Sequence, residues 1–92
     1  MLPRNIIDQY SEHHITLAWR ELHERFGFDL KGWKQLFRDQ FMKQPRNTTE
    51  LDYFLIFGNQ FINPVLNDIL RRRQGFPTFN KFMDYIIERR KD

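Results

Sequence analysis

Basic and amide side chains recur at helical spacing in one short segment of the chain. Lys31, Lys34, Gln35 and Arg38 follow one another at intervals of one, three or four residues, so a helix carries all four on one face. Lysine and arginine bind phosphate groups, and arginine and glutamine also hydrogen-bond base edges in the major groove of DNA. The same residue types are common on solvated helix surfaces. The pattern predicts a candidate nucleic-acid-binding surface at residues 31–38.

The residues before this surface predict a tight turn between two helices. Leu22 and Phe26 end the apolar face of a first helix, and Gly27 follows, a residue that adopts a left-handed backbone cheaply. Asp29 can then cap a second helix. This arrangement over residues 22–37 resembles the helix-turn-helix motif of bacterial DNA-binding proteins.

The resemblance implies that the second helix is a recognition helix and that the protein is a small DNA-binding regulator. Because helix-turn-helix proteins usually bind paired half-sites, it also implies a homodimer. The chain departs from the motif at two positions. His23 stands where the motif has a small residue that lets the helices cross closely, and Trp33 is bulky for its place.

Two arginine-rich segments near the end of the chain are further candidates for phosphate contacts. Arg71, Arg72 and Arg73 form the densest run of charge, and Arg89 and Arg90 lie near the last residue. Arginine binds phosphate through two parallel hydrogen bonds. An alternative is that these cations offset the dipole at the ends of helices.

The distribution of charge favours a basic face. The chain carries a net charge of +3, with a pI of about 9.5. Residues 29–46 carry +3 and residues 71–92 carry +4, whereas residues 47–70 contain no lysine or arginine and carry −3. Such asymmetry is typical of a protein with an anionic partner, and DNA is the partner we expect.

A second hypothesis is a protein-binding adaptor or inhibitor of the phage or plasmid type. The chain holds ten Phe, three Tyr and two Trp, and aromatic and arginine side chains are frequent hot spots at interfaces. Tyr53 and Phe57 lie off the main apolar stripe of their segment. Together with Phe76, they are the expected exposed anchors in this hypothesis.

Catalytic and metal chemistry find little support in the sequence. There is no cysteine, and His13, His14 and His23 lack the spacing of a helical ligand pair. No phosphate-binding loop or hydrolase motif occurs. We therefore expect no enzyme activity, no metal and no cofactor. No signal peptide or apolar run of membrane-spanning length is seen, so we expect a cytoplasmic protein that does not bind membranes.

Periodicity predicts an all-α fold, with residues 1–92 forming one compact bundle of about five helices. The first two helices are expected from Pro3 to Tyr10 and from a Ser11 cap to Phe26, and the third from Asp29 to just before Pro45. The fourth is expected from a capping box at Asn47–Glu50 to Gly75, with a kink or break at Asn63 before Pro64. The fifth begins after Thr78, with Phe79, Phe82, Met83 and Ile86 facing inward.

One alternative affects the middle of the chain. The run "YFLIFGNQFI" at residues 53–62 could form two strands joined by a Gly-Asn turn. Such a hairpin would follow the helix-turn-helix segment where a wing could lie. The helical period of the surrounding residues favours a helix, because the apolar run does not alternate as a one-faced strand does.

Overall fold

A computed structural model of the protein describes residues 10–70 and 76–89, and every regular element in them is helical. The elements are α2 (Glu12–Phe26), α3 (Leu30–Phe41), α4 (Glu50–Phe57), the π-helical turn η1 (Gly58–Ile62), α5 (Asn63–Ile69) and α6 (Phe79–Arg89). The all-α prediction is confirmed for these residues, and the hairpin at 53–62 is wrong. The helix expected at 3–10 and the end expected at Gly75 lie outside the described residues.

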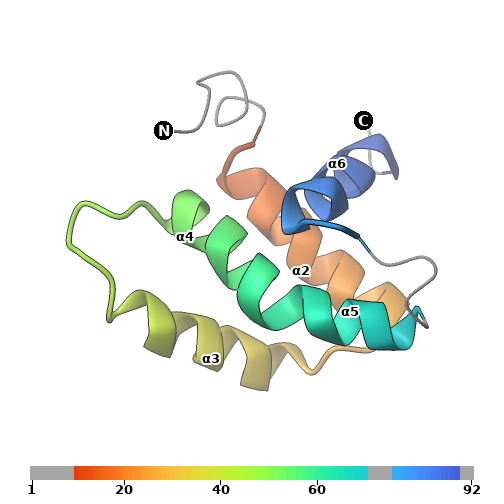
Figure 1. The fold of residues 1–92 in the computed structure, drawn as a ribbon, viewed down its shortest axis with the longest axis horizontal. Coiled ribbons are helices and arrows are strands. Elements are labelled where there is room, and N and C mark those ends of the chain that lie inside the picture. The colour runs from red at the N-terminus through yellow and green to blue at the C-terminus, as the bar shows by residue number, and fades with distance from the viewer. Residues whose placement is uncertain (1–9, 71–75, 90–92) are drawn as a thin grey trace.

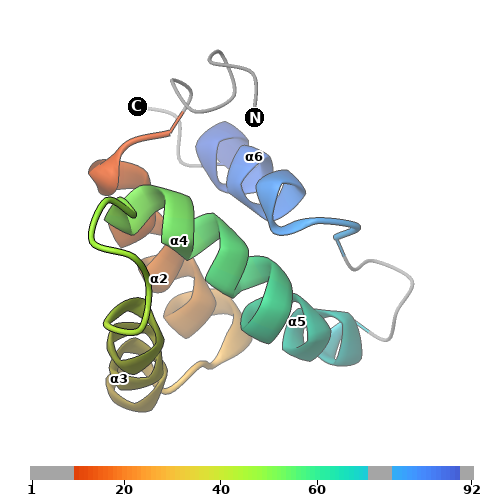
Figure 2. The ribbon, with the colours of Figure 1, turned by 60° about the vertical axis from the view of Figure 1, so that its left-hand side comes forward.

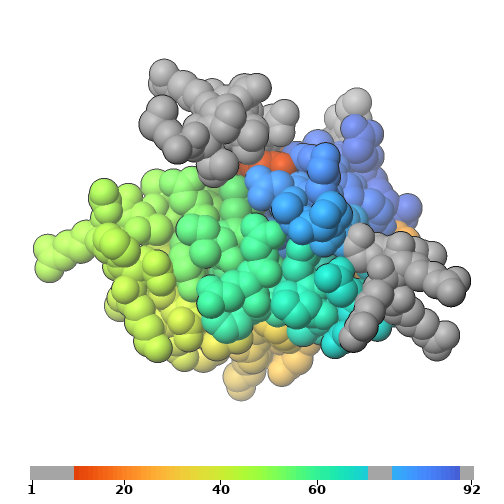
Figure 3. Space-filling model, in the orientation of Figure 1, coloured from red at the N-terminus to blue at the C-terminus, as the bar shows by residue number. Residues whose placement is uncertain are grey.

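The described helices pack around one central rod, which α4, η1 and α5 form as a continuous helical path (Figure 1). The helix α2 packs against α4 and α6, and α3 packs against α4. In both ribbon views α3 and α6 lie on opposite sides of the rod (Figure 2). Side chains fill the spaces between the ribbons, and the rod forms the centre of the face shown in Figure 3.

Local signals fix both ends of α2 as predicted. Ser11 occupies the N-cap position, and its backbone N–H donates to Nδ1 of His14 at 2.9 Å. Gly27 adopts a left-handed backbone with φ of 76°, which glycine does without steric cost. The backbone N–H groups of Gly27 and Phe28 donate hydrogen bonds to the carbonyl oxygens of His23 and Leu22, respectively. These two carbonyl groups near the end of α2 therefore have hydrogen-bond partners.

The start of α3 agrees with the prediction, but its end does not. Asp29 occupies the N-cap position, although its side chain makes no capping hydrogen bond. The helix ends at Phe41, earlier than the expected stop before Pro45. Lys43 and Gln44 donate to the carbonyl oxygens three residues back, and this tightening converts the helix into a turn.

The central rod begins later than predicted, and its helix type changes just before Pro64. The backbone N–H of Asp52 donates to Oγ1 of Thr49 at 3.1 Å, so Thr49 is the cap and the predicted box at Asn47–Glu50 is wrong. Pro64 has no N–H to donate. In the turn before it the hydrogen bonds widen to the π pattern, with Asn63 N–H donating to the carbonyl of Gly58. The π-helical turn therefore lies where the kink or break was expected, and α5 begins at Asn63 with Pro64 in its first turn, as predicted for the start of a new helix.

The inward face of α6 agrees with the predicted one. Phe79, Phe82, Met83 and Ile86 are all fully buried, and the rings of Phe54 and Phe79 meet edge to face. The core therefore lies where α6, α2 and the rod converge.

Candidate functional site

The four predicted nucleic-acid-binding residues of α3 share one exposed surface. Lys31, Lys34, Gln35 and Arg38 are all exposed, and we call them the α3 outer face. On the opposite side of the helix Phe37 is buried, and four further apolar residues pack against the core: Leu30, Trp33, Leu36 and Phe41. The helix is therefore fixed to the body of the protein by one side and presents its charges on the other.

Two members of the α3 outer face make defined local contacts. The amide Nε2 of Gln35 donates to Oδ1 of Asp39 at 2.9 Å, so an acidic group borders the basic residues. Nζ of Lys34 lies 6.0 Å from the centroid of the Trp19 ring on α2, within the range of a cation–π contact. The surface is therefore anchored at one point to the neighbouring helix.

His23 explains one of the departures from the helix-turn-helix motif. Its side chain is exposed, and Nδ1 lies 3.0 Å from the carbonyl oxygen of Phe28. For that hydrogen bond the proton is on Nδ1. The imidazole thus bridges the turn instead of separating α2 from α3, which meet through the edge-to-face rings of Trp19 and Phe37.

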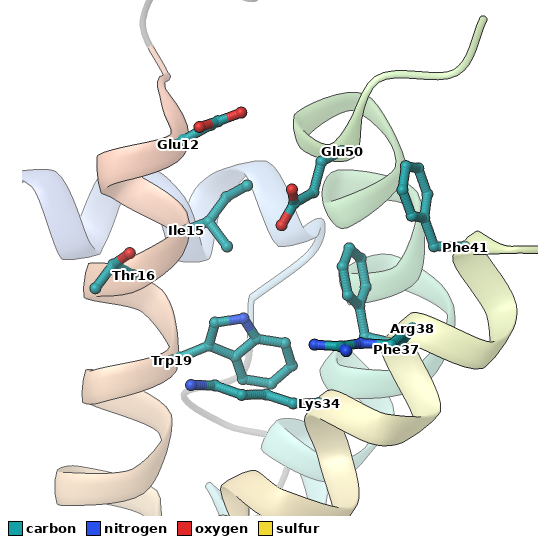
Figure 4. A pocket seen from close by; sticks show the side chains of 9 residues that line it. All are labelled: Glu12, Ile15, Thr16, Trp19, Lys34, Phe37, Arg38, Phe41 and Glu50. Carbon is teal, nitrogen blue, oxygen red and sulfur yellow. The ribbon is translucent and has the colours of Figure 1, made fainter. Parts of the chain in front are cut away.

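A groove of about 480 Å³ separates α2 from α3 and ends at the first turn of α4 (Figure 4). Its apolar surface comes from Ile15 and Trp19 of α2 and from Phe37 and Phe41 of α3. The two phenylalanine rings are parallel, with centroids 5.8 Å apart. The groove therefore offers an aromatic floor, open to solvent on one side.

Charges of both signs border this groove. Lys34 and Arg38 come from α3, and Glu12 and Glu50 come from the first turns of α2 and α4. Figure 4 shows the Arg38 and Glu50 side chains extending into the hollow from different directions. No ion pair forms among these four groups, whose side chains all lie within the described part of the chain. Sequence reasoning missed the groove, because its walls come from three helices.

Of the arginines near the end of the chain, the structure describes Arg89, which does not join the α3 outer face. Arg89 is exposed on α6, on the far side of the rod from α3 (Figure 2). Arg71, Arg72, Arg73 and Arg90 lie outside the described residues.

Arg89 belongs instead to a basic cluster that sequence reasoning missed. Two guanidinium groups lie near the Tyr85 ring, with Arg25 at 5.4 Å and Arg89 at 5.6 Å from its centroid. Arg25 also approaches Glu21 at 3.7 Å. No local signal pairs Arg25 with Arg89, because the contact depends on how α2 packs against α6.

The aromatic anchors of the protein-binding hypothesis are not exposed as expected. Tyr53 is 3 % exposed and Phe57 is 0 % exposed, so both belong to the core. Phe76 is partly buried against the rings of Phe82 and Tyr85. The expectation fails because α4 is covered by α3 on one side and by α2 and α6 on the other.

Three other large apolar side chains in the described residues are exposed instead: Met42, Ile56 and Ile69. Met42 is 78 % exposed in the turn after α3, and Ile56 is 54 % exposed on α4. They come from different parts of the surface.

The described residues hold no group of three or more His, Asp or Glu side chains placed to bind a metal ion. Within residues 10–70 and 76–89, no helix has the length and apolar character needed to cross a membrane.

Comparison with known proteins gives no relative from which a function could be transferred. The sequence matches no protein-family model, and no match is found among curated proteins or solved structures. The α3 outer face and the groove beside it are the candidate binding surfaces of the described residues.

Proposed function

We propose that this protein binds duplex DNA through the α3 outer face and acts as a small regulator. The observation that carries the proposal is the common exposure of Lys31, Lys34, Gln35 and Arg38 on one side of a helix whose other side is packed into the core. Cationic side chains on an exposed helix bind phosphates, and arginine and glutamine can pair with base edges.

The charge around α3 supports this proposal. Residues 29–46 carry a net charge of +3, although Asp39 lies beside the basic residues and accepts a hydrogen bond from Gln35. The hydrogen bond between Gln35 and Asp39 has to break before the Gln35 amide can form hydrogen bonds with a base. We therefore expect the cations to supply most of the affinity, and Gln35 to act in discrimination between sequences.

The resemblance to a helix-turn-helix also supports the proposal. The turn from Gly27 to Asp29 connects α2 to α3 in three residues, with a left-handed glycine at its start. In proteins with this motif the second helix enters the major groove and dimers bind paired half-sites. Here α3 is the corresponding helix, and a homodimer is part of the proposal.

The test is fluorescence anisotropy with a labelled mixed-sequence duplex, across salt from about 0.05 to 0.2 M. We expect affinity to fall steeply with salt because each neutralised phosphate releases counterions. In the double variant Lys34→Ala/Arg38→Ala the logarithmic salt slope should become shallower by roughly 0.9 for each phosphate that the variant no longer neutralises.

The matched control is Lys81→Ala, an exposed cation on α6, on the side of the rod opposite α3. It should bind the duplex like the parent protein. Equal losses of affinity in Lys81→Ala and in the α3 variant would contradict the proposed face, and absence of binding at the lowest salt would contradict DNA binding itself.

A further inference from the structure

The groove beside α3 combines an aromatic floor with charged groups of both signs. Trp19, Phe37 and Phe41 supply the floor, and Arg38 and Glu50 extend into the hollow without forming an ion pair (Figure 4). Its volume of about 480 Å³ lies within the range of roughly 300–1,000 Å³ typical of small-molecule sites. We infer that the groove binds a small zwitterionic molecule with an aromatic body.

The two kinds of charge define the ends of this ligand. Lys34 and Arg38 are placed to receive a carboxylate, and charge-assisted hydrogen bonds of this kind are stronger than neutral ones. Glu12 and Glu50 are placed to receive an ammonium group. Because none of the four is engaged in an ion pair with another described residue, a ligand can pair with them without breaking an existing bridge.

The floor defines the body of the ligand. Of the three aromatic residues in the lining, Phe41 is partly exposed, whereas Trp19 and Phe37 are only 6 % and 7 % exposed. A flat ring of the ligand would therefore pack mainly on Phe41. Aromatic pairs contribute beyond the area they bury when their rings are stacked with an offset or meet edge to face. An aromatic amino acid derivative or a short aromatic peptide with free termini has all three features.

A nucleic acid does not fit this groove. The carboxylates of Glu12 and Glu50 would repel a phosphate group that entered the groove itself. Trp19 is buried among its neighbours, so it does not present a free ring for base stacking. The inference thus goes beyond the proposed DNA binding and does not depend on it, although Lys34 and Arg38 border both surfaces.

The experiment is a titration of the ¹⁵N-labelled protein with the tripeptide phenylalanyl-glycyl-phenylalanine, followed by two-dimensional NMR. The protein holds two tryptophans, of which Trp19 lines the groove and Trp33 does not. We expect the indole N–H signal of Trp19 to shift and that of Trp33 to stay. The titration extends to about 10 mM, so that binding with a dissociation constant of about 1 mM is still detected.

Two modified tripeptides test the two charged ends. The N-acetylated form lacks the ammonium group, and the C-terminal amide lacks the carboxylate. Each should bind roughly two- to five-fold more weakly than the parent peptide, the range typical of exposed ion pairs.

Variants of the groove should show the matching pattern. Arg38→Gln should weaken binding of the parent peptide and leave binding of the amide unchanged. Glu50→Gln should weaken binding of the parent peptide and leave binding of the acetylated form unchanged. Lys31→Gln and Glu88→Gln remove exposed charges that do not line the groove, so both should bind like the parent protein.

Three results would overturn the inference. The first is no shift of the Trp19 signal at the highest concentration, and the second is equal affinity for all three peptides. The third is an equal loss of affinity in the groove variants and the two control variants.

Discussion

The ring of Phe79 lies directly against the α-carbon of Gly58, in space that any side chain at position 58 would enter. This contact joins the central rod to α6. The adjacent Asn59 accepts a hydrogen bond from the backbone N–H of Phe79 through Oδ1, and Asn63 donates to the carbonyl of Phe76 at 3.0 Å. The start of α6 is thus held to the rod by packing and by side-chain hydrogen bonds.

Gly58→Ala should destabilise the protein by about 1–3 kcal/mol, the typical cost of overpacking a core. A methyl group there would overlap the Phe79 ring, which is fully buried. Thermal denaturation followed by circular dichroism gives the change in the free energy of unfolding.

Gly32→Ala is the matched control within α3. A Cβ at position 32 would meet only the exposed side chain of Asp29, at 3.1 Å, and that side chain is free to rotate because it makes no capping hydrogen bond. Replacing glycine by alanine inside a helix should then stabilise the protein by roughly 0.5–1 kcal/mol. Equal changes in the free energy of unfolding for Gly58→Ala and Gly32→Ala would contradict the packing of α6 on the rod.

Stability should fall as the pH drops below about 6.5, the ordinary pKa of histidine, because of His14. Burial lowers the pKa of His14, and the neighbouring charge of His13 lowers it further. The unfolded chain therefore binds the proton more readily than the folded protein. The stabilisation that results from this difference is fully present at a pH above the pKa of His14 in the unfolded chain. It is lost as the pH falls through the pKa of His14 in the folded protein.

His14→Gln isolates this effect, because glutamine can still accept the hydrogen bond from Ser11 N–H. The variant should unfold with a weaker dependence on pH between about 7 and 5. In the variant His13→Gln the pKa of His14 should rise toward its ordinary value, as measured by NMR titration of the imidazole protons. A His14 that titrates at or above the ordinary histidine pKa in the parent protein would contradict this account.

Tyr10→Phe should destabilise the protein by about 1–2 kcal/mol, because it removes a hydrogen bond to a carboxylate. The Tyr10 hydroxyl donates to Oδ1 of Asp84 at 2.6 Å and lies 3.1 Å from the carbonyl oxygen of Asn80. Chemical denaturation with urea would measure the change, and Asp84→Asn provides the reciprocal variant. A change below about 0.3 kcal/mol would contradict the role of this bond.

The same tyrosine should give the protein a loss of stability at alkaline pH. Burial raises the pKa of Tyr10, and the hydrogen bond to Asp84 and its negative charge raise it further. The stabilisation is complete below the ordinary tyrosine pKa of about 10 and is lost as the pH rises toward the folded value. In Tyr10→Phe the remaining alkaline loss of stability should be smaller.

Single substitutions on α3 should separate the two proposed binding activities. Arg38 borders both the α3 outer face and the groove, whereas Lys31 does not line the groove. Arg38→Ala should weaken binding of both duplex DNA and the aromatic tripeptide, and Lys31→Ala should weaken DNA binding alone. Anisotropy and NMR titrations of both variants measure this, and a tripeptide affinity reduced in Lys31→Ala would contradict the separation.

The sequence by itself determined the features that depend on neighbours along the chain. The left-handed turn at Gly27, the bounds of α2 and the inward face of α6 all follow from residues within one helix or next to it. The common face of Lys31, Lys34 and Arg38 follows from helical spacing in the same way. These features are local, because a cap, a turn and a helical period need no distant partner.

Tertiary structure alone decided which apolar residues are covered and where charges meet. Tyr53 and Phe57 are buried because other helices cover α4 on two sides. The periodicity of apolar residues predicts which side of a helix is buried, but it does not predict how many other helices pack against it. Lys34 of α3 and Glu50 of α4 line the same groove although they belong to different helices. The residues of this site come from three separate helices, α2, α3 and α4. They meet only because these helices pack together to bury their shared aromatic core.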